Sequence, residues 1–130
     1  MPTVREMVDD AKTRIDNLSM EQVEAERREG TALLIDVRDV RELWREGKIP
    51  GARHVPRGML EFWADPESEY YKDFMQPDAR VILYCAGGLR SALAADTLNR
   101  LGYRDVGHLE IGFDEWKNRG GEVAEVSQKR

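Results

Sequence analysis

The fold of this chain is decided by the stretch Val81-Ile82-Leu83-Tyr84-Cys85-Ala86-Gly87-Gly88-Leu89-Arg90-Ser91. It opens on an apolar, β-branched run, 81–84, which predicts a buried strand. It leads into residues 92–101, where Ala94, Leu98 and Leu101 recur on one face of a helix. The segment between them is therefore a strand-to-helix turn, a connection typical of α/β proteins with a parallel sheet.

Cys85, the only cysteine of the chain, ends this strand. Backbone N–H groups at a helix start lack intrahelical partners and carry the positive end of the helix dipole, so they favour an anion in the turn. Gly87 and Gly88 let these groups converge, and Arg90 adds a permanent cation. The thiolate is the reactive form of cysteine, and such surroundings stabilise it. We predict that Cys85 is a nucleophile, against the alternative of an inert core cysteine.

The composition indicates one domain with no nucleic-acid or membrane partner. The 130 residues carry a net charge of −5, and the 35% of charged residues are interspersed rather than clustered by sign. No stretch approaches the roughly 18 apolar residues of a membrane span, and the N-terminus lacks the apolar segment of a signal peptide. A single cysteine excludes an internal disulfide and a cysteine-rich zinc cluster, and suits a reducing compartment. We expect a cytoplasmic protein without metal or cofactor.

The rest of the chain alternates helical and extended patterns. A capping box at Ser19 and Gln22 opens one helix, which Gly30 would close. The other expected elements are an amphipathic helix over 3–16, a strand over 32–37, a helix over 40–45 that ends at Gly47, two short helical pieces within 60–75, a strand over 106–109 and a helix over 113–119 before Gly120-Gly121. The apolar stripe of the first helix is expected to pack on its own domain rather than on a partner.

Three segments together resemble rhodanese-type sulfurtransferases. Cys85, four intervening residues and Arg90, followed by Ser91, are similar to the six-residue active-site loop of that family. The other two segments are Ile35-Asp36-Val37-Arg38 with Glu42 and the run 47–56 after it, and the run Leu109-Glu110-Ile111-Gly112-Phe113-Asp114-Glu115-Trp116. They stand in family order and span roughly residues 15 to 120. The resemblance implies a three-layer α/β fold, with a mainly parallel sheet of about five strands flanked by helices on both faces.

On this basis we divide the chain into an N-terminal helical extension, 1–17, a rhodanese-like domain, 18–122, and a C-terminal tail, 123–130. The resemblance implies that Cys85 takes the outer sulfur of a donor such as thiosulfate as a persulfide and passes it to cyanide or a thiol, or to a sulfur-accepting protein. The loop N–H groups would hold the charged persulfide. The residues of this loop are Ala86, Gly87, Gly88, Leu89, Arg90 and Ser91.

Other polar residues receive supporting roles. Arg90 could bind an anion or brace the loop through a salt bridge. If the turn after Val55-Pro56 faces the cysteine loop, as the resemblance implies, Arg57 could bind the sulfonate end of a donor; otherwise it is a solvated side chain. We expect Asp36, Arg38 and Glu42 to form a bracing network.

The two histidines and one aromatic pair receive no part in the chemistry. We expect His54 to fix a loop by a hydrogen bond, and we find no acid pattern that would make His108 half of a dyad. Phe62 and Trp63 either wall the pocket or belong to the core.

Two other activities compete with sulfur transfer. Cysteine-dependent phosphatases and arsenate reductases also place a cysteine in an anion-binding loop before an arginine, but their loops are longer, and four residues leave less room for a tetrahedral oxyanion. A non-catalytic interaction module would not need Cys85, both glycines and Arg90 together. The chain also departs from the family pattern. Arg90 is the only cation of the loop, which weakens the case for thiosulfate as donor, and Ile111 stands where the family commonly has a first glycine.

Overall fold

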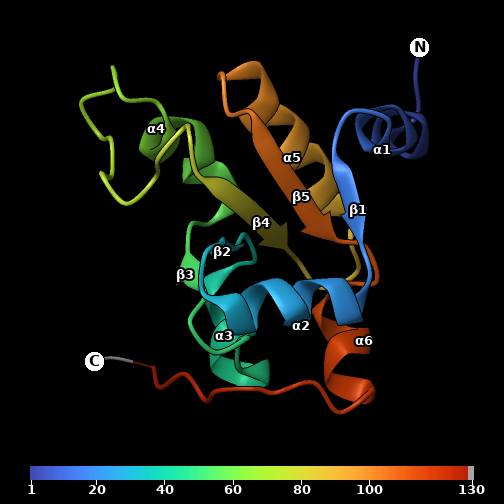
Figure 1. The fold of residues 1–130 in the computed structure, drawn as a ribbon. Coiled ribbons are helices and arrows are strands. Elements are labelled where there is room, and N and C mark those ends of the chain that lie inside the picture. Colours follow the sequence, from blue (N-terminus) through green and yellow to red (C-terminus); the bar gives the residue numbers. More distant parts are fainter. Residues whose placement is uncertain (129–130) are drawn as a thin grey trace.

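A five-stranded parallel sheet organises the chain, with strand order β1-β5-β4-β2-β3 (Figure 1). The computed structural model describes residues 1–128. The strands are β1 (Asp16–Leu18), β2 (Leu33–Asp36), β3 (Arg53–His54), β4 (Arg80–Tyr84) and β5 (Asp105–Leu109). Each neighbouring pair runs parallel. This confirms the predicted α/β class with a parallel sheet of about five strands.

Helices cover both faces of the sheet, as predicted (Figure 1). One face packs against α1 (Val4–Lys12), α4 (Leu60–Ala64) and α5 (Leu89–Arg100), and the other against α2 (Met20–Glu29) and α6 (Gly112–Asn118). The remaining helices are α3 (Val40–Glu46) and a single 3₁₀ turn, η1 (Arg57–Met59). As predicted, Ser19 and Gln22 form a capping box at the start of α2, Gly30 ends that helix, and Gly47 ends α3.

Strand β4 lies at the centre of the fold, and its side chains alternate between two buried clusters. Val81 and Leu83 pack with α5, whereas Ile82 and Tyr84 face the α6 side. All four are at most 1% exposed. Full burial of side chains of this size stabilises the folded state by about 1.5–3 kcal/mol each. Cys85 continues the pattern onto the α5 face, so the alternation of the strand aims the thiol under the start of that helix.

The N-terminal segment joins the fold more closely than the sequence predicts. Helix α1 packs on α5 with Val8 and Ala11 buried, as expected for its apolar stripe, and Ile15 is buried just after the helix. It ends at Lys12 rather than at residue 16, because the chain then turns into β1, which adds a strand beside β5. This strand was not predicted, and the boundary drawn at residue 17 falls inside it. A three-residue strand with two exposed positions carries too little periodicity to stand out in the sequence.

Two further expectations are corrected. Helix α5 begins at Leu89, three residues before the predicted start, so Leu89, Arg90 and Ser91 form its first turn. Of the two helical pieces expected in 60–75, only α4 forms, and the chain continues through turns to β4. Aromatic contacts hold this region. Phe62 is exposed and packs edge-to-face on Tyr70 at 6.3 Å. Trp63 packs against the core on the α5 face, and Lys72 lies 5.1 Å from its ring centre.

The first part of the C-terminal tail is docked. Ala124 exchanges two backbone hydrogen bonds with Lys48, at 2.9 and 2.8 Å, and the Trp116 indole donates to the Glu122 carbonyl. Residues 129–130 of the predicted tail lie outside the described residues.

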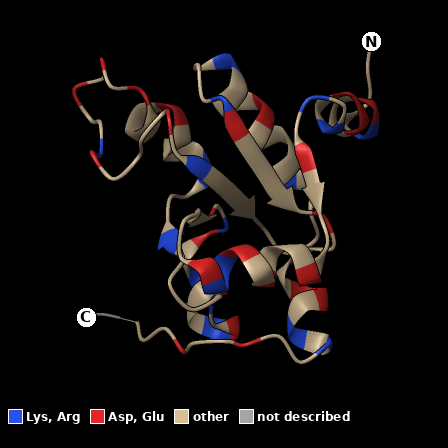
Figure 2. Ribbon diagram, viewed as in Figure 1, with Lys and Arg blue, Asp and Glu red and all other residues tan. Residues whose placement is uncertain are grey.

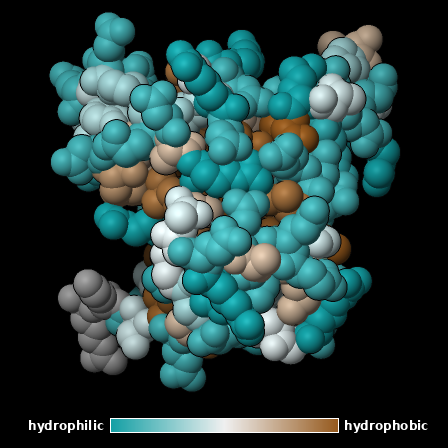
Figure 3. All heavy atoms as spheres, in the orientation of Figure 1, coloured by the Kyte–Doolittle hydropathy of each residue, from teal (hydrophilic) through white to brown (hydrophobic). Residues whose placement is uncertain are grey.

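In the view of Figure 2, Lys and Arg residues are interspersed with Asp and Glu residues along the ribbon. The same face is mostly hydrophilic with small separate apolar spots (Figure 3). Among residues 1–128, no helix is both long and apolar enough to cross a membrane.

Candidate active site

The sulfur of Cys85 lies at the N-terminus of α5, and the residue as a whole is 1% exposed. Two backbone N–H groups donate to Sγ, from Gly88 at 3.2 Å and from Ser91 at 3.3 Å. These amides belong to the helix positions that lack intrahelical partners and carry the positive end of the dipole. The predicted role of the helix start is thus visible in the geometry, because the free donors point at the sulfur and favour a negative charge there.

Helix α6 fixes the other side of the loop. The Phe113 and Asp114 amides donate to the carbonyl oxygens of Cys85 and Ala86, at 2.8 and 3.1 Å. This close docking requires Gly112, which has φ +82°, and a Cβ there would clash with the Ala86 carbonyl. Ile111 takes ordinary helical angles, so its replacement of a family glycine leaves the backbone undisturbed. Gly88, at φ +90°, likewise approaches the Glu110 carbonyl too closely for a side chain.

A line of neutral hydrogen-bonding groups runs behind the sulfur. Cys85 Sγ lies 3.5 Å from Ser91 Oγ, which lies 2.8 Å from His108 Nδ1. His108 Nε2 is 2.9 Å from Asn17 Oδ1. Ser91 and His108 are both fully buried. Burial, with a smaller contribution from the Lys12 cation, lowers the pKa of His108 to about 4, so its imidazole is neutral near pH 7.

Sequence reasoning missed this line because it depends on β1. Asn17, His108 and Leu83 are register partners across β1, β5 and β4, so their side chains lie on the same face of the sheet as Cys85. The signal that could have pointed to His108 was a histidine inside an otherwise apolar strand, one residue before that strand ends.

Asp36 and Arg38 form a buried ion pair at the carboxyl end of β2. Asp36 accepts from the Arg38 backbone N–H at 3.0 Å and from Nη2 at 2.7 Å, and the pair is at most 1% exposed. Arg38 also donates to the Gly47 carbonyl and stacks 4.2 Å from the Phe113 ring centre. Burial is the largest single influence and opposes its charge, but the Asp36 hydrogen bonds together with the charges of Asp36 and its neighbours hold the pKa of Arg38 above its usual value.

Glu42 does not join that pair directly and instead binds Arg90. The two groups form a bidentate pair with distances of 2.9 and 3.0 Å. These hydrogen bonds raise the pKa of Arg90 and lower that of Glu42. Glu42 also caps α3 by accepting from the Asp39 amide. Arg90 was predicted either to bind an anion or to brace the loop. Its contacts with Glu42 join α5 to α3, as in the bracing role.

Arg57 does not reach the cysteine in this structure. It donates to Glu61 at 2.9 Å and to Thr97 at 3.3 Å, and lines a hollow of about 570 Å³ formed with α1 and α5. The residues that line this hollow do not include any of the cysteine loop.

The remaining polar candidates are local supports. His54 bonds the Arg38 carbonyl through Nε2 at 2.7 Å, which confirms the predicted loop-fixing contact. Within residues 1–128, no three His, Cys, Asp or Glu side chains are grouped so that they could hold a metal ion.

Comparison with known proteins places the chain in a family. The family model described as "Rhodanese-like domain" matches residues 19–119. The thiosulfate sulfurtransferase/rhodanese-like domain-containing protein 3 of Mus musculus is 30% identical over 102 residues, which are 75% of this chain and 64% of that protein. This chain therefore spans less than two thirds of that relative.

Two solved structures share the fold. RPA3614 of Rhodopseudomonas palustris CGA009, a protein of unknown function described as a possible tyrosine phosphatase, is 43% identical with a TM-score of 0.91, covering 95% of this chain and 96% of that one. The human single-domain sulfurtransferase TSTD1 is 24% identical with a TM-score of 0.70, covering 79% and 96%, a likeness of fold alone. Since the family model covers most of the sequence and includes the cysteine loop, the chain belongs to the rhodanese-like family.

Proposed function

We propose that this protein is a sulfurtransferase that carries sulfane sulfur as a persulfide on Cys85. The observation that carries the proposal is the pair of amide donors from Gly88 and Ser91 on Sγ at the start of α5. These donors stabilise negative charge on the attacking thiolate. The sulfurtransferase names of several relatives in sequence support the same activity.

The reaction has two nucleophilic steps. The Cys85 thiolate attacks the outer sulfur of a donor such as thiosulfate, a new S–S bond forms, and the S–S bond of the donor breaks as its electron pair leaves with sulfite. Cyanide or a thiolate then attacks the outer sulfur of the persulfide, and the Cys85 thiolate returns. The second nucleophile could also belong to a sulfur-accepting protein. We place this chemistry in the cytoplasm, where a lone thiol stays reduced.

The sulfur donor is not assigned, because the only cation of the loop, Arg90, already pairs with a carboxylate. Arg90 is held by Glu42 in a two-point contact, so its charge is largely balanced. An anionic donor must compete with that carboxylate or bind beside it. Thiosulfate therefore serves as the probe of sulfur loading rather than as the assigned physiological substrate.

The proposal is tested by intact-mass measurement of the protein before and after incubation with thiosulfate. We expect a gain of one sulfur atom that a reductant reverses, and no gain in Cys85→Ser, which changes only the chain's single thiol. Steady-state thiocyanate formation from thiosulfate and cyanide should vanish in the same variant. Equal turnover in the variant would contradict the assignment.

A phosphatase is the second candidate, favoured by the description of RPA3614. Hydrolysis of p-nitrophenyl phosphate that requires Cys85, without any sulfur loading, would support it. The four-residue spacing between Cys85 and Arg90 argues against it. If the protein is a non-catalytic interaction module, neither activity is expected. Its Cys85 should then react with iodoacetamide at neutral pH no faster than a free thiol does.

A further inference from the structure

The line Cys85–Ser91–His108–Asn17 is buried except at its outer end, Asn17, and it contains one hydroxyl proton with two possible acceptors. Ser91 Oγ lies 2.8 Å from His108 Nδ1 and 3.5 Å from Cys85 Sγ. Its O–H can point at the imidazole nitrogen or at the sulfur, but not at both. Which way it points decides whether the sulfur meets a proton donor or a lone pair.

Asn17 settles the direction by fixing the imidazole tautomer. Its Nδ2 donates to the Lys12 carbonyl at 2.9 Å and to the Ile15 carbonyl at 3.4 Å, so its Oδ1 faces His108 as an acceptor. His108 Nε2 must then carry the proton, since two acceptors cannot share a hydrogen bond. Nδ1 is left as an acceptor, and Ser91 is the donor that it meets.

In this arrangement the lone pair of Ser91 faces the sulfur. A protonated Cys85 can donate its S–H to that lone pair, whereas a thiolate would face it without a proton. We propose that His108, oriented by Asn17, is a positioning residue that draws the Ser91 hydroxyl proton away from Cys85 and so favours the thiol in the resting protein. The inference rests on the proposed function only in taking Cys85 as the reacting group. When the thiolate forms, the hydroxyl must turn to the sulfur and leave the buried Nδ1 without its donor.

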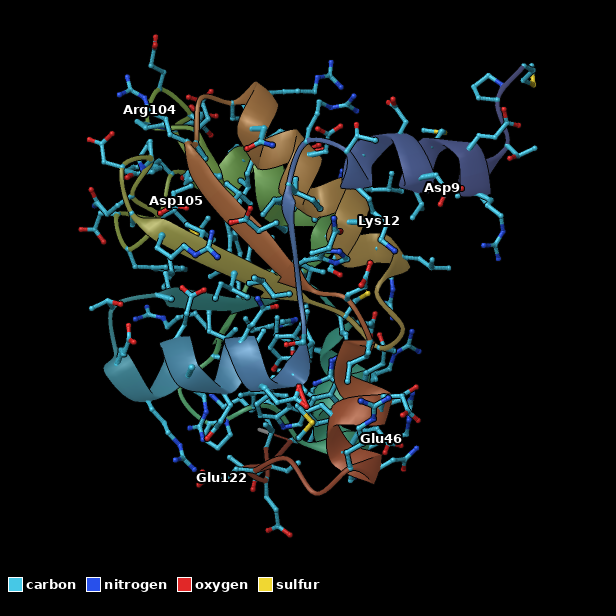
Figure 4. The ribbon with its side chains drawn as sticks, turned by 45° about the vertical axis from the view of Figure 1, so that its right-hand side comes forward. Asp9, Lys12, Glu46, Arg104, Asp105 and Glu122 are labelled. Atoms are coloured by element: carbon cyan, nitrogen blue, oxygen red, sulfur yellow. The ribbon has the colours of Figure 1, made fainter. Side chains whose placement is uncertain are left out.

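The neighbouring charges act on both groups but do not replace this hydroxyl. Arg90 of α5, with Glu42 of α3 and Asp36 at the end of β2, forms the charged surroundings on the Cys85 side. Lys12 and Glu110 face His108 from α1 and from the segment after β5, and they pair with each other at 2.9 Å. Figure 4 shows Lys12 at the end of α1 nearest β1. None of these residues is changed in the test below.

The test is the pH dependence of iodoacetamide alkylation, which reports on one site because Cys85 is the only cysteine. His108→Phe removes the competing acceptor and fills the site with another ring. We expect its alkylation midpoint to fall by about one pH unit, a tenfold gain in thiolate below the midpoint, which corresponds to about 1.4 kcal/mol. Asn17→Ala should shift the midpoint in the same direction by less, because the imidazole can then move its proton to Nδ1.

The decisive measurement is the double variant. Because the effect of His108 passes through the hydroxyl, His108→Phe should shift the midpoint in the parent but not in a Ser91→Ala background. The proposal is overturned if His108→Phe shifts the midpoint equally in the parent and in the Ser91→Ala background. It is also overturned if His108→Phe or Asn17→Ala alone leaves the midpoint unchanged. Loss of folding would instead bring the midpoint to that of a free thiol, about 8.5, in every variant that unfolds, and would be seen by circular dichroism. The readout needs no sulfur donor, so failure of sulfur loading leaves it intact.

Discussion

Two buried polar systems lie side by side at the carboxyl edge of the sheet, and they are built on opposite principles. At the end of β2, Asp36 and Arg38 form a fully charged pair whose groups are closed off by each other, by Gly47 and by the Phe113 ring. At the end of β4, the Cys85 line is neutral at rest, and its Cys85, Ser91 and His108 side chains can each exchange a proton or turn a hydroxyl. The first has one stable arrangement, whereas the second has at least two.

This difference shows where the fold keeps its freedom. A buried charge without its partner is strongly destabilising, so the Asp36–Arg38 pair holds its geometry and braces the segment around β2 and β3. A neutral line can change its hydrogen bonds at much smaller cost. Reactivity at Cys85 thus depends on a mobile proton inside a rigid charged frame. The predictions below test this contrast.

The largest effect is expected at the charged pair. Asp36→Ala leaves Arg38 charged and buried, so the free energy of unfolding should fall by about 3–5 kcal/mol, measured by urea denaturation. The double variant Asp36→Ala with Arg38→Met removes both charges and should recover most of that loss. Ser91→Ala in the neutral line should cost about 1 kcal/mol by the same measurement. Similar losses for Asp36→Ala and Ser91→Ala would erase the contrast.

A smaller, pH-dependent effect is expected at His108. Its pKa is lowered to about 4 by burial, whereas the unfolded chain binds this proton near the ordinary value of 6.5. Stability from this group is therefore complete above pH 6.5 and is lost as the pH falls toward 4. Between pH 7.5 and 4.5, the parent should lose roughly 2–3 kcal/mol more than His108→Phe in urea unfolding. Equal losses would show that the imidazole charges as easily folded as unfolded.

The smallest effect is expected at the rim of the loop, where Glu42 and Arg90 are partly exposed. Glu42→Gln keeps the helix cap but removes the charge, and solvent screening limits the stability loss to less than about 1 kcal/mol. The freed Arg90 should attract anions, so the KM for thiosulfate should fall with little change in kcat. Glu46→Gln, on the same helix and paired with Lys117, serves as the control. A fall of KM in both variants would point to general charge and not to Arg90.

The sequence predicts the α/β fold and the position of the nucleophile because both rest on local patterns. The apolar run of β4, the glycines and the single cysteine stand within one short segment. The Asp36–Arg38 pair is equally local, and its bracing role was expected from the sequence. The buried line could not be predicted in the same way, because Asn17 and His108 meet only through the pairing of β1 with β5. Arg90 shows a related limit, since its partner Glu42 lies 48 residues away.

Strand β1 also bears on the behaviour of the chain in concentrated solution. It covers one side of β5, where Gly107, His108 and Leu109 would otherwise present unpaired backbone groups along a buried strand. Such open strands pair readily with copies of themselves and start aggregation. With β1 in place, the edge strand of the sheet on this side is only three residues long and begins with the exposed polar residues Asp16 and Asn17. Such a short, polar edge strand is a poor template for pairing with another chain. A variant that begins at residue 19, where the family match begins, would lack β1. We expect it to aggregate at protein concentrations at which the longer chain remains in solution.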